Sequence, residues 1–336
     1  MNGMEKKRSR KVLIKAAVAL AAIILGYIAV HYMMEGGILS RQMTSLIPRI
    51  GINIILAVSL SITVGFLGEL SLGHAGFMAI GAYSSAIFTT QAAGLPGFLS
   101  FVSALMIGGV MAALFGVITG IPVLRLRGDY LAIVTLAFTE IIRSVINTMS
   151  ITGGAMGLSN IPDYANYTWI YILGILTILV AVNLRKSRHG RAILSVRENY
   201  VAAEAMGIPV TKFKILAFAV AAFFAGIAGA LYAHTYSVLR PGNFDYNKSI
   251  DILIFVVLGG MGNIPGAIAA TILLTYLPEK FREFGDYRML IYALALIIIM
   301  ILNSGEMKKK LKGFVQKVIP YGRVKRKKSQ ETEGEH

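Results

Sequence analysis

The chain has 336 residues, of which 56% are hydrophobic and only 15% are charged, and its mean hydropathy is +0.67. Soluble domains contain about 25% charged residues, so this composition excludes a water-soluble globule of this size. The net charge of +16 gathers in basic stretches beside apolar segments, which favours membrane topology and anionic lipid over nucleic acid as its cause.

Repeated apolar runs of nearly 20 residues predict membrane-spanning helices. The runs are continuous rather than alternating, which favours helices over a β-barrel. In chain order, we predict spans at 12–34, 50–67, 74–91, 98–123, 130–149, 167–184 and 213–234. The first of these is too long for a signal peptide and lacks a small-x-small cleavage site, so we expect it to be retained.

The apolar segment 250–277 is interrupted by Gly259-Gly260-Met261-Gly262-Asn263 and by Pro265. These residues disfavour one continuous helix, so we predict two shorter helices, 250–258 and 265–276, joined by a glycine turn. A final span follows at 289–302. The fold class is therefore an all-α polytopic membrane protein with about ten transmembrane helices.

Charge bias predicts the topology. Ten passes put the basic loops and both basic termini on the cytoplasmic side, whereas nine would put the lysine-rich tail outside. We therefore expect a basic cytoplasmic N-terminus at 1–11, one transmembrane domain at 12–304 and a basic cytoplasmic tail at 305–336.

The longest polar interruption between the first and last apolar segments is Arg185–Lys214. Within it, one helix is predicted over 191–206, ended by Gly207 and Pro209. The segment could be a docking surface for a soluble partner or a solvated connector. The apolar face of the predicted helix would carry Ile193, Val196, Tyr200 and Ala203.

Two glycine-rich segments point to a transport path. Gly65–Gly81 reads GFLGELSLGHAGFMAIG, and 258–263 reads LGGMGN. Irregular backbone at membrane depth is tolerated only where protein or a water-filled cavity covers it, and paired breaks in the two halves of a chain mark transporter binding sites. His74 by itself fits a hydrogen-bonded structural residue better than a ligand.

Charged residues also lie inside or at the edges of the predicted spans. Glu140 and Arg143 share one helix face and should pair or face water, as a structural ion pair or as contacts for a zwitterionic solute. Asp129 and Asp251 are expected to cap the helices that begin there.

No catalytic pattern is present. No glycine is followed by lysine, so there is no Walker A loop, and no HExxH or paired-cysteine motif occurs. We therefore expect no enzyme activity, no metal and no cofactor, with ATP bound by partner subunits as the energy source.

Several motifs in order over 50–302 resemble the LivM-type permeases of branched-chain amino acid ABC importers. Glu69 departs from that pattern, since the family often has glutamine there. The matching stretches are Gly68–Phe77, Ile80–Tyr83, Arg125–Leu136, Glu140–Arg143, Thr152–Gly154, Ala202–Ile208 and Val257–Gly262.

The resemblance implies a permease subunit in a bacterial plasma (inner) membrane that moves leucine, isoleucine and valine inward by ATP-driven alternating access. Its implied partners are two LivG/LivF-like ATPases, a LivH-like second permease and an extracytoplasmic solute-binding protein, with membrane lipid around it and no nucleic acid. Urea, an amide or another small polar solute is the alternative cargo. An ATP-independent secondary transporter is the alternative mechanism.

Two groups of site residues are predicted. The translocation pathway is expected to contain Glu69, Ser71, Gly73, His74, Gly76, Gly81, Glu140, Arg143, Gly259, Gly260 and Gly262. Coupling to the ATPase is expected to involve Arg191, Arg197, Glu198, Ala203, Glu204 and Gly207.

Overall fold

The computed structural model describes residues 25–28, 30, 32, 41–91, 96–126, 128–282 and 287–303. Most of the predicted first span, 12–34, and both predicted cytoplasmic termini lie outside the described residues. The chain divides into two compact units, residues 1–276 and 277–336, and each is described by itself.

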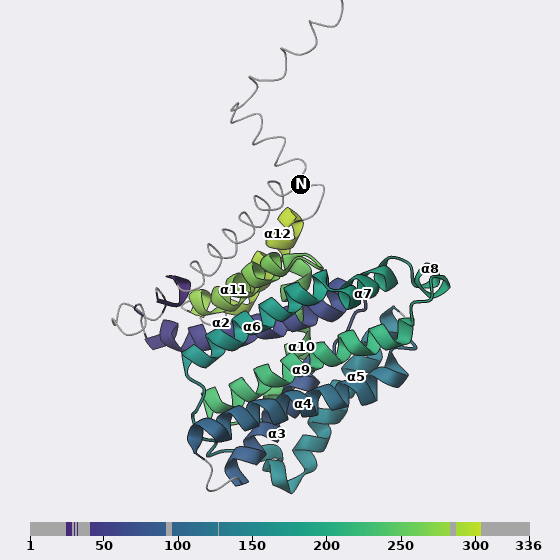
Figure 1. The fold of residues 1–336 in the computed structure, drawn as a ribbon. Coiled ribbons are helices and arrows are strands. Elements are labelled where there is room, and N and C mark those ends of the chain that lie inside the picture. The colour runs from purple at the N-terminus through teal and green to yellow at the C-terminus, as the bar shows by residue number, and fades with distance from the viewer. Residues whose placement is uncertain are drawn as a thin grey trace, which may run out of the picture. The chain divides into compact units, whose positions relative to one another are not determined.

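The first unit is built from helices (Figure 1). An isolated antiparallel bridge between Leu158 and Leu239 joins two of its loops. The helices are α2 (Arg41–Leu60), the π-helix η1 (Ser61–Leu67), α3 (His74–Gln91), α4 (Gly97–Val123), α5 (Asp129–Thr148), α6 (Tyr167–Lys186), α7 (Arg188–Glu198), α8 (Tyr200–Ala205), α9 (Val210–Tyr236) and α10 (Tyr246–Gly259). Short 3-10 turns are η2 (Ser150–Thr152), η3 (Gly154–Met156) and η4 (Pro241–Phe244).

Helix α11 (Ile264–Lys280) begins in the first unit and continues into the second, which also contains α12 (Arg288–Asn303). The predicted break at the glycine cluster is confirmed, because α10 ends at Gly259 and α11 begins at Ile264. Five helical stretches are long and apolar enough to cross a membrane, namely Met43–Leu67, Gly97–Val123, Asp129–Thr148, Tyr167–Lys186 and Val210–Tyr236. The all-α polytopic class is confirmed, and the count of ten stays a prediction.

Helix α9 lies at the centre of the first unit, where it packs against α2, α3 and α4. Glycines allow three of these backbones to meet. A Cβ atom on Gly81 of α3 would lie 2.3 Å from the Cα of Gly226 on α9, and one on Gly226 would lie 2.4 Å from the carbonyl oxygen of Gly108 on α4. Lipid gives helices no hydrophobic reason to associate, so such close approach supplies the van der Waals contact that holds them together.

The single helix predicted over 191–206 is wrong, because the segment forms two helices. Asn199 interrupts it with extended backbone, and its side-chain oxygen accepts hydrogen bonds from the N–H groups of Val201 and Ala202. This side chain satisfies the first N–H groups of a new helix, which favours a restart over continuation. The predicted stop at Gly207 is confirmed by its φ of +79°.

Two predicted helix caps are also wrong. Asp129 is the first residue of α5 and follows Gly128 as the N-cap, which makes no side-chain capping bond. Helix α10 begins at Tyr246, ahead of the predicted residue 250, so its cap is Asp245, whose side chain accepts from the N–H of Lys248. Asp251 therefore lies inside the helix, where its backbone N–H needs no cap.

Candidate functional site: a junction of broken helices

The first break follows α2. The helix widens into the π-helix η1 and ends at Gly68, whose φ is +79°. The chain then runs without regular structure from Gly68 to Gly73 before α3 begins. A π-helical turn places backbone groups outside the usual i→i+4 ladder, and such turns are frequent at functional sites.

Side chains from α5 and α10 satisfy the backbone of this irregular segment. The N–H of Leu72 donates to the hydroxyl of Thr135 at 2.9 Å, and the hydroxyl of Thr139 donates to the carbonyl of Leu72 at 3.1 Å. The N–H of Ala75 donates to Ser249 at 3.1 Å. Thr139 lies roughly 15 Å along α5 from its first residue, which is about half the thickness of a hydrocarbon core. Irregular backbone thus reaches membrane depth with its polar groups satisfied, as requires.

His74, at the start of α3, is buried and bonded to α2. Its Nε2 lies 2.8 Å from the hydroxyl oxygen of Ser59, and that hydroxyl also donates to the carbonyl of Leu56 at 2.8 Å. A serine has one hydroxyl proton, so when that proton goes to Leu56 the histidine ring must donate to Ser59. The contact agrees with the structural interpretation of His74.

The two glycine breaks meet. A Cβ atom on Gly65 would lie 2.7 Å from the backbone nitrogen of Gly262, so the two backbones touch without intervening side chains. Arg197 of α7 donates to the carbonyl of Gly65 at 2.5 Å, and Arg185 of α6 donates to the carbonyl of Gly262 at 3.0 Å. We call these four residues the glycine junction. Hydrogen bonds from charged donors are among the stronger ones in proteins, so the polar segment 185–214 is tied firmly to both breaks.

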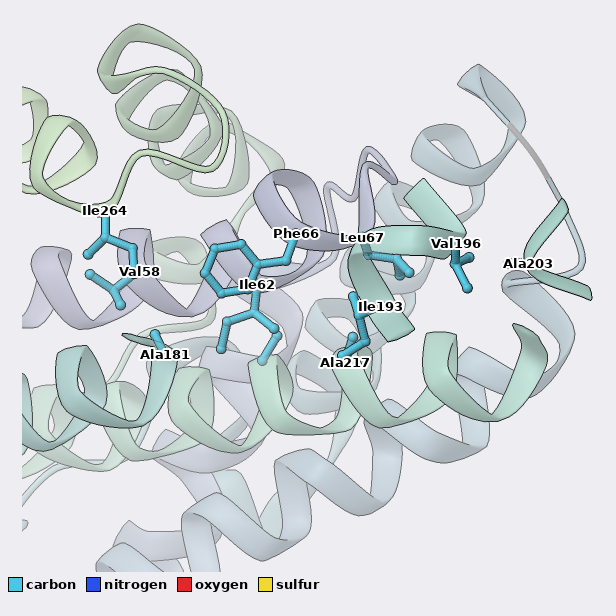
Figure 2. Packing of buried hydrophobic residues seen from close by; sticks show 11 residues of the cluster. Val58, Ile62, Phe66, Leu67, Ala181, Ile193, Val196, Ala203, Ala217 and Ile264 are labelled. Atoms are coloured by element: carbon cyan, nitrogen blue, oxygen red, sulfur yellow. The ribbon is translucent and has the colours of Figure 1, made fainter. Parts of the chain in front are cut away.

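An apolar cluster fixes α7 against the π-helix next to this junction (Figure 2). Phe66 and Leu67 of η1 belong to the same buried cluster as Ile193 and Val196 of α7. The other members are Val58, Ile62, Ala181, Ala203, Ala217, Ala221 and Ile264. Because closely packed side chains transmit displacement, a movement of α7 must also move η1.

Glu69, predicted to line the pathway, forms an ion pair with Lys214 near the start of α9. The side chains are only 16% and 10% exposed, respectively, so the pair is largely removed from water. Sequence reasoning did not single out Lys214, because the two residues lie 145 positions apart and only the fold brings them together.

We expect Lys214→Met to destabilise the protein strongly, because it leaves the carboxylate of Glu69 buried without a partner. Breaking a buried pair costs about 3–5 kcal/mol, whereas replacing both partners by apolar residues is often neutral. Thermal unfolding in detergent should therefore show a large loss for Lys214→Met and recovery in Lys214→Met with Glu69→Leu. Arg282→Met, which breaks the more exposed pair with Glu279, is the matched control and should cost under about 1 kcal/mol. A double variant no more stable than the single one would contradict this prediction.

Glu140 and Arg143 form the expected ion pair within α5, with 2.6 Å between the Glu140 Oε2 and Arg143 Nη2 atoms. The other carboxylate oxygen of Glu140 accepts from the N–H of Tyr246 at 3.2 Å. The pair thus also satisfies the first N–H group of α10, where a negative charge is favourable. Both oxygens of Glu140 have protein partners, while the side chain of Arg143 remains 41% exposed.

With this geometry described, comparison with known proteins decides the family. Residues 42–302 match the family model for the branched-chain amino acid transport system permease component. The chain belongs to this family.

Three relatives illustrate the breadth of this permease family. The high-affinity branched-chain amino acid transport system permease protein LivM of Escherichia coli (strain K12) is 34% identical over 323 residues, covering 86% of this chain and 74% of that protein. The nucleoside ABC transporter permease protein NupC of Lactococcus lactis is 26% identical, covering 69% and 84%. LivH of Salmonella typhimurium is 24% identical, covering 76% and 92%. No solved structure matches the chain.

In this permease, the remaining predicted pathway residues fall into two places. Gly73 and Gly76 face Thr135 and Thr139, beside the irregular segment, and Ser71 is buried there. The others are not brought to that segment. Gly81 lies at the crossing of α3, α4 and α9, while Gly259 packs closely on Ala267 of α11 and Gly260 adopts a φ of +92° in the turn.

The predicted coupling residues of the permease are mostly on its surface. Ala203 is buried in the apolar cluster, and Arg197 reaches the glycine junction. Arg191 is exposed and donates to the carbonyl of Lys186 at 3.0 Å. The remaining three, Glu198, Glu204 and Gly207, are exposed.

Sequence reasoning missed a polar chain that links three helices of the permease. Lys248 of α10 donates to the side-chain oxygen of Asn53 on α2 at 2.9 Å, and the amide nitrogen of Asn53 donates to Thr275 of α11 at 3.1 Å. A lysine within an apolar helix is the signal that could have drawn attention to it.

Proposed function

We propose that the chain is the membrane-spanning permease subunit of an ABC importer that moves branched-chain amino acids into the cell. It works with two ATPase subunits, a second permease of the LivH type and an extracytoplasmic solute-binding protein. Both termini and the segment 185–214 face the cytoplasm. Membership of the permease family supports this assignment, as does the printed transport function of the similar LivM protein.

The observation that carries the proposal is the glycine junction. Arg185 and Arg197, from the polar segment 185–214, hold the carbonyl groups of both membrane-embedded breaks. A force applied to α7 would thus reach the irregular segment that begins at Gly68. Alternating access needs such a mechanical connection between a cytoplasmic motor and the backbone around the solute, since coupling requires an element with two arrangements that both sites bias.

The docking surface for the ATPase lies on α8 and the turn that follows it. Val201 is 58% exposed and Met206 is 82% exposed, beside the exposed carboxylate of Glu204. This segment is polar and lies between two apolar spans, so its exposed apolar side chains face water rather than lipid. Exposed apolar side chains with a polar rim are typical of protein interaction sites.

Solute passes along the irregular segment 68–76, beside Glu140 and Arg143, and towards the turn at 259–262. Polar groups at this depth are costly unless they serve a polar path, which supports a passage rather than a purely structural break. Arg143 keeps a partly exposed guanidinium that could bind the carboxylate of an amino acid.

Reconstitution tests the function. The chain is placed in liposomes with the ATPases and the second permease encoded alongside it, and the binding protein is loaded with leucine. We expect uptake of leucine and hydrolysis of ATP that rises with loaded binding protein. Hydrolysis that ignores the loaded binding protein would overturn the proposal, and gradient-driven uptake by the purified chain would favour a secondary transporter.

A nucleoside is the second candidate cargo, because NupC is also a relative. Titration of the binding protein with leucine, isoleucine, valine, urea and a nucleoside separates these possibilities. The assignment to branched-chain amino acids fails if only one of the other solutes binds.

We expect Glu204→Lys combined with Gly207→Trp to uncouple ATP hydrolysis from uptake. The first change reverses a charge on the docking surface, and the second adds a large side chain at a residue with a φ of +79° and open space around it. Both residues are exposed, so insertion into the membrane should be unaffected. Uptake, hydrolysis and the amount of assembled complex are measured together, and unaltered uptake would reject a docking role.

A further inference from the structure

Lys248 is placed unusually for a lysine in an apolar helix bundle. It lies in the first turns of α10, and its ammonium group bonds to the neutral amide oxygen of Asn53, a residue only 5% exposed. It makes no ion pair within the described residues. A charge that leaves water without a charged partner is costly, so its retention at such a depth calls for a function.

The charged groups near Lys248 do not complete an ion pair. Asp245 uses its carboxylate to cap α10 and to accept from the side chain of Asn247. Asp251, one turn further along α10, is exposed, and Arg49 on α2 adds a second positive charge. Within hydrogen-bonding reach, the ammonium group meets a neutral partner.

The free capacity of the polar chain consists of donors. Asn53 has its oxygen bonded to Lys248 and its nitrogen bonded to Thr275. The ammonium group of Lys248 has three N–H protons, of which Asn53 accepts one. Thr275 accepts from Asn53, which leaves its hydroxyl proton to donate. A group that accepts several hydrogen bonds and carries negative charge, such as a carboxylate, fits this set.

Lys248 also remains open to a ligand. Its side chain is partly buried rather than sealed, while Asn53 and Thr275 behind it are buried. Neighbouring Ser249 holds the start of α3 through Ala75, so the lysine lies beside the irregular segment on which the proposed passage depends.

We propose that Lys248, positioned by Asn53 and supported by Thr275, binds the carboxylate of the solute as it passes through the permease. This inference rests on the proposed function and names one group of the solute that the membrane domain itself recognises. Lys248 belongs to α10, which ends at Gly259 beside the glycine junction, so solute binding and the coupling element share one helix.

A purely structural role is the competing explanation, in which Lys248 only ties α10 to α2. The two roles differ in what they require. A tether needs a hydrogen-bond donor, which glutamine supplies, whereas carboxylate binding needs a positive charge, which only arginine preserves.

Three variants in the reconstituted importer test this inference: Lys248→Gln, Lys248→Arg and, as a control, Lys212→Gln at an exposed lysine. We expect Lys248→Gln to lower leucine uptake at least tenfold while the complex still assembles. Lys248→Arg should keep most of the uptake, and the control should match the wild type. Equal uptake by Lys248→Gln and the wild type would overturn the inference, as would equal losses in both Lys248 variants.

A measurement without transport separates this inference from the proposed function. The unfolding temperature of the purified chain is recorded with leucine, with leucinamide, which lacks the carboxylate, and with acetate. We expect leucine and acetate to raise the unfolding temperature of the wild type but not of Lys248→Gln, and leucinamide to have no effect. An equal effect of leucine and leucinamide, or none from either carboxylate, would reject the site even if leucine is transported. Stabilisation by acetate in a chain that does not transport leucine would retain a carboxylate site and reject the proposed cargo.

Discussion

Gly226→Ala is expected to destabilise the permease by about 3 kcal/mol, the upper part of the usual range for overpacked cores. An added Cβ atom would lie 2.4 Å from the carbonyl oxygen of Gly108 and 2.5 Å from the Cβ atom of Ala112. The first of these is a backbone atom, so α4 and α9 must separate to admit the methyl group. That separation also loosens α3, which crosses at Gly81. Thermal unfolding in detergent measures the effect.

Gly174→Ala on α6 is the matched control. This glycine is also buried in a helix, but the nearest atom to an added Cβ lies 4.0 Å away, on Ile55. Alanine is the better helix former by about 1 kcal/mol, so this change should be neutral or stabilising. Equal unfolding temperatures for the two variants would show that close packing at Gly226 does not hold the helices together.

Arg197→Met is expected to lower solute uptake by about tenfold or more while leaving ATP hydrolysis largely intact. The change removes the hydrogen bond from α7 to the carbonyl of Gly65 but keeps an apolar stem of similar length. A hydrogen bond to a charged group contributes about 1.5–3 kcal/mol, and each 1.4 kcal/mol is a factor of ten in an equilibrium. Without the bond, α7 can move with the ATPase and leave the π-helix behind. Uptake and hydrolysis in liposomes give the ratio directly.

Arg185→Met removes the corresponding bond to Gly262 and should act in the same direction. If both arginines act through one junction, the double variant should lose less than the product of the two single losses. Arg188→Met, at an exposed position of α7, is the control. Parallel losses of uptake and hydrolysis that follow the amount of folded protein would show that Arg197 contributes stability rather than coupling.

Local patterns were sufficient to predict most of the described elements. The predicted span 74–91 coincides with α3, and the glycine cluster correctly predicted the separation of α10 from α11. These features depend on neighbouring residues alone, because hydrophobic length and backbone freedom are properties of a short stretch. Where local signals compete, the prediction failed. Asn199 could continue a helix or cap a new one, and the structure shows the second.

The candidate site was only partly accessible to sequence reasoning. The two glycine breaks and the segment 185–214 were each recognised separately. Their contact through Arg185 and Arg197 was not, because Arg197 and Gly65 are 132 residues apart and their pairing leaves no local pattern. The same holds for Glu69 with Lys214 and for Asn53 with Lys248, whose partners are chosen by how the helices pack.

The sequence alone therefore determined the membrane class, the family and the positions at which the helices break, because apolar length, charge and glycine content act locally. Only the tertiary structure decided that the breaks join in one junction held by the polar segment, and that Lys248 lies against a neutral amide. Those features arise from close helix packing, in which small residues set how near two backbones come and so which distant polar groups meet.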